Sequence, residues 1–258
     1  MSGISGLGIA DFVDENGVIT ADVPVQNYKQ SYTMNEVSAF TSFTSRMWMF
    51  GIQRNDLTAA TEQLKTAIAR AKEQLCAERL DNIFSSTYTH NGIGGARSIT
   101  ITGGDGLAGC TSSHTREDGG TNMNNGVYDG TTYNLPFDYS GLKAGFRTAG
   151  LMVDPRGNPM IPDLTTLVVK KNSNVHTTAM ERLSAINRGR IPESNDNDGS
   201  GVPAFTILAL PYLTNASYWH MFDPSMMRNN SGFQFVEARP VFTEPAFEVY
   251  KTSEIQKK

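Results

Sequence analysis

The sequence has few of the residues that form crosslinks or bind metals: its 258 residues include two cysteines and four histidines. Cys76 and Cys110 permit one disulfide, but two free thiols in a reducing compartment are the favoured interpretation. The histidines lie far apart in the sequence, at His90, His114, His176 and His220. None of the HxxxH, HxH or Cys–His spacings that are typical of zinc sites is present. We therefore expect no metal site, no cofactor and no redox function.

Excess charge and long hydrophobic runs are also lacking. The chain carries 22 Lys and Arg against 26 Asp and Glu, and this formal charge of −4 is not the basic surface that tight nucleic-acid binding needs. Any contact with DNA is expected to be weak and without sequence specificity. No run of about 18 apolar residues occurs, and residues 1–17 lack the basic start of a signal peptide. We expect a soluble protein that is neither membrane-bound nor secreted.

Glycine, asparagine, threonine and serine make up for a low apolar content of 39% and a charged content of 19%. Globular domains typically have roughly 45–50% apolar residues, with glycine included, and about 25% charged residues. The composition indicates a globular protein with long irregular segments. The chain is long enough for one large or two modest domains with a sizeable core.

Two acidic stretches are similar to calcium loops but lack necessary ligands. In residues 194–201, Asp196 and Asp198 fit such a loop, but Phe205 stands where a bidentate Glu is required. Residues 117–130 carry carboxylates only at Glu117, Asp118 and Asp129, without a spacing that would organise them around one ion. Solvated loops are the favoured interpretation of both.

Catalytic motifs are equally weak. GDGLAG at 104–109 has the G-x-G-x-x-G spacing, but no helical pattern follows it to bind a pyrophosphate. Neither a nucleophile elbow nor a P-loop occurs. A hydrolase that uses His114 with Asp118 or Glu117 is the enzymatic alternative, yet no nucleophile stands at an activating position. We expect a protein that is not an enzyme.

The first third of the chain predicts an extended hairpin or arm followed by a long helix. Residues 22–47 are rich in Val, Tyr, Thr and Phe, with apolar residues at even spacings, which favours extended structure. Across 56–84 apolar residues recur three or four positions apart, which predicts an amphipathic helix. Asn55 or Asp56 is expected to cap its first turn.

The rest of the chain predicts an α+β protein with a mixed or antiparallel sheet. Residues 85–132 show little periodicity apart from one expected strand at 98–102. Further strands are expected at 164–169, 205–210, 217–222, 233–238 and 246–250.

Two shorter helices are expected between these strands. One runs over 142–149, capped by Asp138 or Ser140, and the other follows Ser173 or Asn174. The aromatic residues near 217–222 are expected in the core or a subunit interface rather than on nucleic-acid bases, because few basic residues flank them; they are Tyr212, Tyr218, Trp219, His220 and Phe222.

The order of these segments resembles that of the major capsid proteins of tailed bacteriophages, which share the Hong Kong 97 phage capsid fold. Residues 26–57 look like the extended loop that runs into a spine helix, and 67–84 look like the end of that helix. Residues 105–125 are similar to a segment that precedes an Asn-rich loop. In 142–183 a helix, a D-x-x-G-N-P hairpin, a strand and a second helix follow the family's order. So do the strand, P-Y-L-T turn and W-x-x-x-D strand of 205–224.

The resemblance implies a subunit with a long spine helix, peripheral and axial domains and an extended loop. The segments would be an N-terminal segment at 1–20, the extended loop at 21–53, the spine helix with a peripheral-domain segment at 54–134, a mainly axial domain at 135–235, and a C-terminal strand returning to the peripheral domain at 236–258.

The implied function is self-assembly into hexamers and pentamers that close an icosahedral head around double-stranded DNA. Such a protein is found in the virion, is assembled in the host bacterial cytoplasm, and has portal and scaffolding or decoration proteins as partners. An encapsulin-like compartment shell is one alternative. A calcium-dependent surface binding module is the alternative from a different class.

Overall fold

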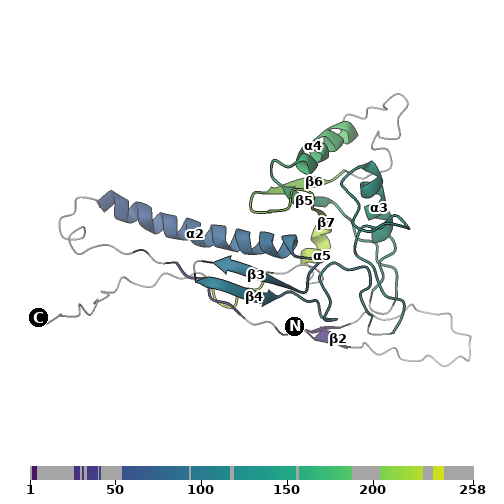
Figure 1. Cartoon of the computed structure of the whole chain (residues 1–258), viewed down its shortest axis with the longest axis horizontal. Coiled ribbons are helices and arrows are strands. Elements are labelled where there is room, and N and C mark those ends of the chain that lie inside the picture. The colour runs from purple at the N-terminus through teal and green to yellow at the C-terminus, as the bar shows by residue number, and fades with distance from the viewer. Residues whose placement is uncertain are drawn as a thin grey trace, which may run out of the picture.

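The computed structural model describes residues 2–4, 26–29, 31, 34–39, 41, 54–92, 94–116, 119–154, 157–187, 204–228 and 235–240. Helices and strands are mixed along these residues, which confirms the expected α+β class. A long helix extends to one side, and a small sheet with two helices stands at the other end of the molecule (Figure 1).

The long helix, α2, spans Arg54–Asp81, which is 28 residues or about 42 Å. The expectation that Asn55 or Asp56 caps it is wrong, because the helix already includes both and a cap must precede the first helical residue. At the other end the Asn82 side chain donates to the Glu78 carbonyl oxygen at 2.8 Å. The chain then turns away, so α2 ends three residues earlier than its apolar period predicted.

A β-hairpin lies beside the second half of α2. Its strands are β3 (Thr87–Gly92) and β4 (Gly95–Thr100), paired antiparallel. The sequence predicted a strand only at 98–102, so the irregular structure expected over 87–92 is wrong. Tyr88 is the one buried side chain of β3, and the other positions are polar or glycine, which left no apolar alternation to detect.

The inward face of the hairpin is joined to α2 by polar contacts. His90 Nδ1 lies 2.6 Å from Glu78 Oε2, and the Arg79 guanidinium lies 5.8 Å from the centre of the Tyr88 ring. The hairpin therefore depends on the helix, as expected for two strands that bury little by themselves.

The main sheet has three strands in the order β6-β5-β7, and it is mixed, as one of the two expected arrangements. β5 pairs parallel with β6 and antiparallel with β7, which puts it in the centre; the strands are β5 (Thr166–Lys170), β6 (Thr206–Leu210) and β7 (Trp219–Phe222). Leu167 and Val169 of β5 are fully buried and Val168 is nearly so. A central strand covered on both faces reads as a continuous apolar run.

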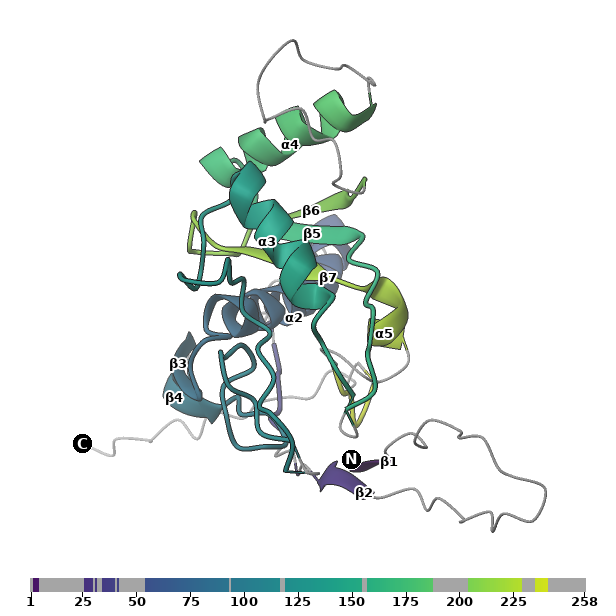
Figure 2. The ribbon, with the colours of Figure 1, turned by 90° about the vertical axis from the view of Figure 1, so that its right-hand side faces the viewer.

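Two helices cover one face of this sheet (Figure 2). They are α3 (Tyr139–Ala149) and α4 (Asn174–Asn187). Asp138 caps α3 by accepting from the Gly141 N–H at 2.6 Å, and the Ser173 hydroxyl caps α4 by accepting from the His176 N–H at 3.1 Å. Both caps were among the expected alternatives. The core between helices and sheet contains Phe137, Leu142, Leu167, Val169, Ala179 and Phe205.

The D-x-x-G-N-P motif forms the expected hairpin between α3 and β5. Val153 pairs with Pro159, and the Asp154 carboxylate accepts from the Asn158 N–H at 2.8 Å. Gly157 has φ +87°, a conformation that favours glycine, and a Cβ placed there would lie 2.5 Å from an Arg116 guanidinium nitrogen. The motif therefore fixes both a turn and a close approach of the neighbouring loop.

The remaining segments are part of the expected arm, two strands expected near the C-terminus, and one short helix. Residues 26–29 of the expected arm form β2 (Gln26–Lys29), paired with β1 (Ser2–Ile4). The strand expected at 233–238 is wrong for 235–238, which have no strand pairing. The strand at 246–250 lies outside the described residues. A short helix, α5 (Pro224–Arg228), was not predicted, and Asp223 caps it by accepting from the Ser225 N–H and hydroxyl.

Candidate functional site

The segment after the hairpin folds back on itself beside the end of α2. Backbone pairs join His114 to Met123 and Tyr128 to Tyr133, and Cys110 N–H donates to the Ile83 carbonyl at 2.9 Å. We call residues 103–116 the dyad loop, after the acid–histidine pair it contains. No helix opens after its glycines, as expected from the sequence.

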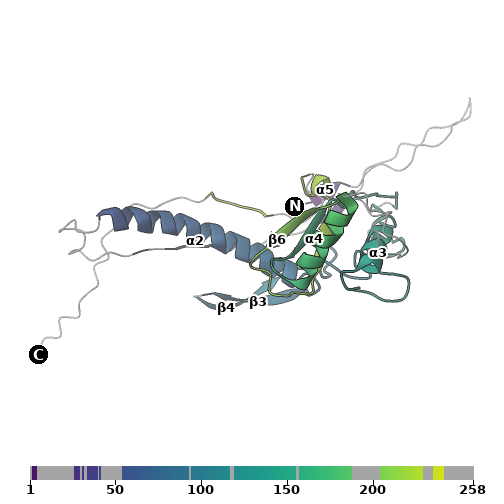
Figure 3. The ribbon, with the colours of Figure 1, turned by 90° about the horizontal axis from the view of Figure 1, so that it is seen from above.

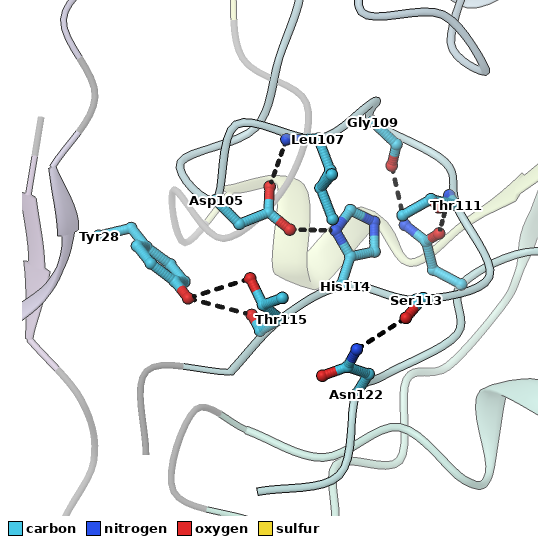
Figure 4. Close-up of polar contacts among 10 residues, drawn as sticks. Tyr28, Asp105, Leu107, Gly109, Thr111, Ser113, His114, Thr115 and Asn122 are labelled. Atoms are coloured by element: carbon cyan, nitrogen blue, oxygen red, sulfur yellow. Dashed lines mark hydrogen bonds and ion pairs between the residues drawn. The ribbon is translucent and has the colours of Figure 1, made fainter. Parts of the chain in front are cut away.

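The pair consists of Asp105 and His114. His114 Nδ1 lies 2.7 Å from Asp105 Oδ2, and Asp105 Oδ1 accepts from the Leu107 N–H at 3.1 Å (Figure 4). Only 6% of the Asp105 side chain and 15% of the His114 side chain are exposed. His114 Nε2 is buried and makes no hydrogen bond among the described residues.

Asn125 closes the loop from the other strand of the fold-back. Its Oδ1 accepts from the Thr111 N–H at 2.9 Å, and its Nδ2 donates to the Gly109 carbonyl at 2.8 Å. Both polar groups of the amide are thus bonded to backbone, which satisfies buried loop groups that have no strand partner. The loop is therefore a rigid, internally bonded unit.

The two cysteines are free thiols, as the sequence favoured. Burial raises the pKa of Cys110 to about 11, and its Sγ donates to the Asn125 carbonyl at 3.7 Å. Burial also raises the pKa of Cys76. Both thiols are protonated at neutral pH, so neither is the thiolate that a cysteine nucleophile requires.

The dyad loop also receives a strand of the arm. The Tyr28 hydroxyl lies 3.3 Å from both the carbonyl oxygen and Oγ1 of Thr115. A Cβ added to Gly104 would lie 2.6 Å from the Tyr28 Cβ, so β2 packs directly on the glycine. These contacts place β2 against the dyad loop.

An acid–histidine pair can serve a hydrolase only when the histidine reaches a nucleophile. Among the described residues, no hydroxyl or thiol bonds to Nε2 of His114. The partner of His114 is Asp105, which the sequence analysis did not consider. Glu117 and Asp118 lie outside the described residues.

The other candidate residues are not brought together. Asp129 accepts from the N–H groups of Thr131 and Thr132, and the Thr132 N–H is the main cause of its lowered pKa. Phe205 is buried in the core, and residues 194–201 lie outside the described part. Within the described ranges no group of three or more His, Cys, Asp or Glu could hold a metal.

The aromatic residues around β7 lie in the core, as one of the two expected locations. Trp219 packs against the core beneath α3, its ring 5.3 Å from that of Phe137, and its Nε1 donates to the Leu135 carbonyl at 3.0 Å. Tyr212 and Phe222 pack on the opposite face of the sheet, against the end of α2. Tyr218 is half-buried, and its ring lies edge-on to that of Phe84.

Large apolar side chains are exposed at several other places. Leu151 and Ile161 flank the open end of the D-x-x-G-N-P hairpin and are 74% and 85% exposed. Along α2, Leu64, Ile68 and Leu75 are only half-buried. Apolar groups of this kind mark surfaces that another chain can cover.

The chain matches no family model, no curated protein and no solved structure. In the described part, none of the helices combines the length and the hydropathy needed to cross a bilayer.

Proposed function

We propose that this chain is a shell-forming structural subunit, the major capsid protein of a tailed bacteriophage. The observation that carries the proposal is the partial burial of the apolar side chains of α2. Among the described side chains of this helix of about eight turns, Ala77 and Leu80 near its end are buried. The larger apolar side chains before them are only half-covered; they are Leu64, Ile68 and Leu75. Such a helix gains most of its stability from packing of an apolar face, so a neighbouring surface is needed.

The order of the elements supports the same proposal. A long helix, a hairpin beside it, a folded loop, and then a compact unit of helices and a small sheet follow the order of the capsid family that the sequence resembles. Residues 235–240 return to the long helix, where Glu237 Oε1 lies 2.6 Å from Lys72 Nζ.

The specific capsid fold and its domains follow from this proposal. The helix, hairpin and dyad loop would belong to the peripheral domain, and the sheet with α3 and α4 to the axial domain. β2 would be the base of an extended loop that covers a neighbour. A formal charge of −4 fits an inner wall that releases packaged DNA readily, because few phosphates would be neutralised.

Electron microscopy of the purified protein, with sedimentation velocity over a range of concentrations, tests the proposal. Closed shells or ring-shaped capsomers are expected. A monomer that persists at millimolar concentration contradicts it. Nuclease-protected DNA inside particles recovered from cells separates a virus head from an encapsulin-like compartment, which would contain protein cargo instead.

A further inference from the structure

The end of α2 meets the three-stranded sheet in a small apolar joint. Ala77 and Leu80 of the helix pack against Val168 of β5 and against Leu213, and none of the four is more than 6% exposed. From this joint α2 runs away from the sheet, both in the view of Figure 1 and from above in Figure 3. The direction of the whole helix is therefore set at one end.

A carboxylate fastens this joint. Asp81 Oδ2 accepts from the N–H and hydroxyl of Thr214 at 2.7 and 2.8 Å, and Oδ1 accepts from the Asn215 N–H at 3.3 Å. A negative charge in the last turn of a helix is opposed by the helix dipole, so these donors stabilise it there. Lys170 of β5 holds the same turn by donating to the Thr214 carbonyl at 2.8 Å.

His220 lies inside this joint. It stands directly opposite Val168 in the β5–β7 pairing, on the face of the sheet that α2 covers, and is 9% exposed. Its ring centre is 6.4 Å from that of Tyr218 and 6.3 Å from that of Phe222. Nε2 is buried and makes no hydrogen bond among the described residues.

We propose that this joint is an acid-sensitive hinge, in which proton uptake by His220 releases the end of α2 from the sheet. A charged imidazole needs acceptors for both ring N–H groups, and burial among apolar groups without them is unfavourable. The nearest carboxylate, Asp81, is already engaged by Thr214 and Asn215. Opening of the joint exposes the imidazole ring to water, which supplies the missing acceptors. Protonation of His220 therefore favours the open joint.

The other titratable groups around the joint do not compete for this role. Lys170 donates to the Thr214 carbonyl and is engaged there. The pKa of Asp223, which follows β7, is lowered chiefly by the Ser225 hydroxyl. Tyr212 packs against the joint, and the Tyr218 ring meets the His220 ring edge-on. Asp81 is the one charge that favours proton uptake by His220, and burial outweighs it.

The direction of the pH effect follows from the two states. Burial lowers the pKa of His220 to about 4 in the closed joint, whereas in the open joint it returns to an ordinary value near 6.5. Between these values the open form binds more protons, so opening becomes about tenfold more favourable for each pH unit of acidification. The limit is about 300-fold, half of which is reached near pH 4 and the rest below it. Above about pH 7 this group contributes no pH dependence.

Hydrogen exchange of the full chain tests the hinge. After correction for the intrinsic effect of pH on exchange, protection in residues 77–84 and 211–218 is expected to fall about tenfold per unit between about pH 6 and pH 4.5. Protection in α3 serves as the internal reference. Light scattering on the same samples separates hinge opening from dissociation of particles, because the hinge belongs to the single chain and does not require assembly.

Two variants make the test specific. His220→Phe keeps an aromatic ring but removes the titrating group, so the pH slope is expected to disappear. His176→Gln removes a half-buried histidine on α4, at a distance from the joint, and should keep the slope. An NMR titration of His220 in the unaltered chain does not depend on how either variant folds. A pKa near 6.5 in the folded chain, or a slope that persists in His220→Phe, overturns the proposal.

Discussion

The sheet end and the helix end of the molecule differ in how they are held together. At the sheet end, Leu167, Val169 and Ala179 have no exposed surface, and α3 and α4 supply the matching apolar faces. At the helix end, α2 and the β3–β4 hairpin bury Tyr88 between them but otherwise meet through polar contacts such as His90 with Glu78. The sheet end has a buried apolar core of its own. The described residues of the helix end instead form a framework with few buried side chains.

Because of this difference, the residues that stabilise the fold and the residues that are available for contacts lie in different parts of the chain. Fully packed residues determine whether a protein folds, while half-covered apolar residues are free to pack on something else. The sheet end is therefore expected to control unfolding of the monomer. If the proposed function holds, the helix end is where contacts between copies of the chain are expected.

The largest expected effect comes from removing core volume at the sheet end. Leu167→Ala should lower the free energy of unfolding by about 2–5 kcal/mol, because it leaves a cavity at a position with no exposed surface. Leu64→Ala on α2, at a half-buried position, should lower it by less than about 1.5 kcal/mol. Urea unfolding followed by circular dichroism measures both. Equal losses would show that the two ends are packed alike.

The next effect concerns the fastening between the two ends. Asp81→Asn removes the charge that accepts from Thr214 and Asn215, and should lower the free energy of unfolding by about 1.5–3 kcal/mol. Glu62→Gln is the matched control, since its carboxylate pairs with Lys65 on the exposed surface of α2 and should change stability by less than about 1 kcal/mol. Thermal unfolding monitored by calorimetry compares them. If Asp81→Asn is as mild as the control, the ends are joined by apolar contact alone.

A smaller effect on the free energy of unfolding is expected at two loop glycines. Comparing them distinguishes backbone strain from close packing. Gly106 and Gly157 both have positive φ, but a Cβ at Gly106 meets nothing within 4 Å, whereas one at Gly157 meets Arg116 at 2.5 Å. Gly106→Ala should destabilise by about 1 kcal/mol from backbone strain, and Gly157→Ala by about 1 kcal/mol more. Chemical unfolding of the two variants gives the difference. A zero difference would mean that Arg116 moves aside freely.

The smallest effect is expected on the exposed side of the helix end. Lys72→Met removes the charge that pairs with Glu237 but keeps an apolar stem near the Phe235 ring, so the loss should be under about 1 kcal/mol. Because both side chains are more than a third exposed, the loss should shrink in about 0.5 M salt. Unfolding at low and high salt tests this. A loss that salt does not change would place the pair in a drier environment than its exposure indicates.

The parts of the fold that the sequence predicted have a local apolar signal. β5 appears as a run of buried aliphatic residues, α2 as a repeat of three and four, and Asp138 and Ser173 as caps before apolar periods. β3 was missed because Tyr88 alone is buried in it. The local apolar pattern was sufficient to predict an element that buries several apolar side chains, and insufficient to predict one that buries a single side chain.

The site was harder to predict because its contacts join residues without periodicity. Asp105 and His114 are nine positions apart in a Gly-rich loop, and nothing in their spacing distinguishes this pair from Glu117 or Asp118. Tyr28 meets Thr115 from 87 positions away. Contacts of this kind are fixed by the path of the backbone, which a single sequence does not reveal.

The contact between Asp81 and Thr214 spans 133 positions of sequence. At translation rates of roughly 5–20 residues per second, α2 is synthesised on the order of 10 s before the turn that fastens it exists. During that time its apolar positions lack the sheet, and charged residues such as Glu62 and Lys65 alternate with them along the helix. The subunit is thus made with its longest element undocked, and it completes its shape only as synthesis ends.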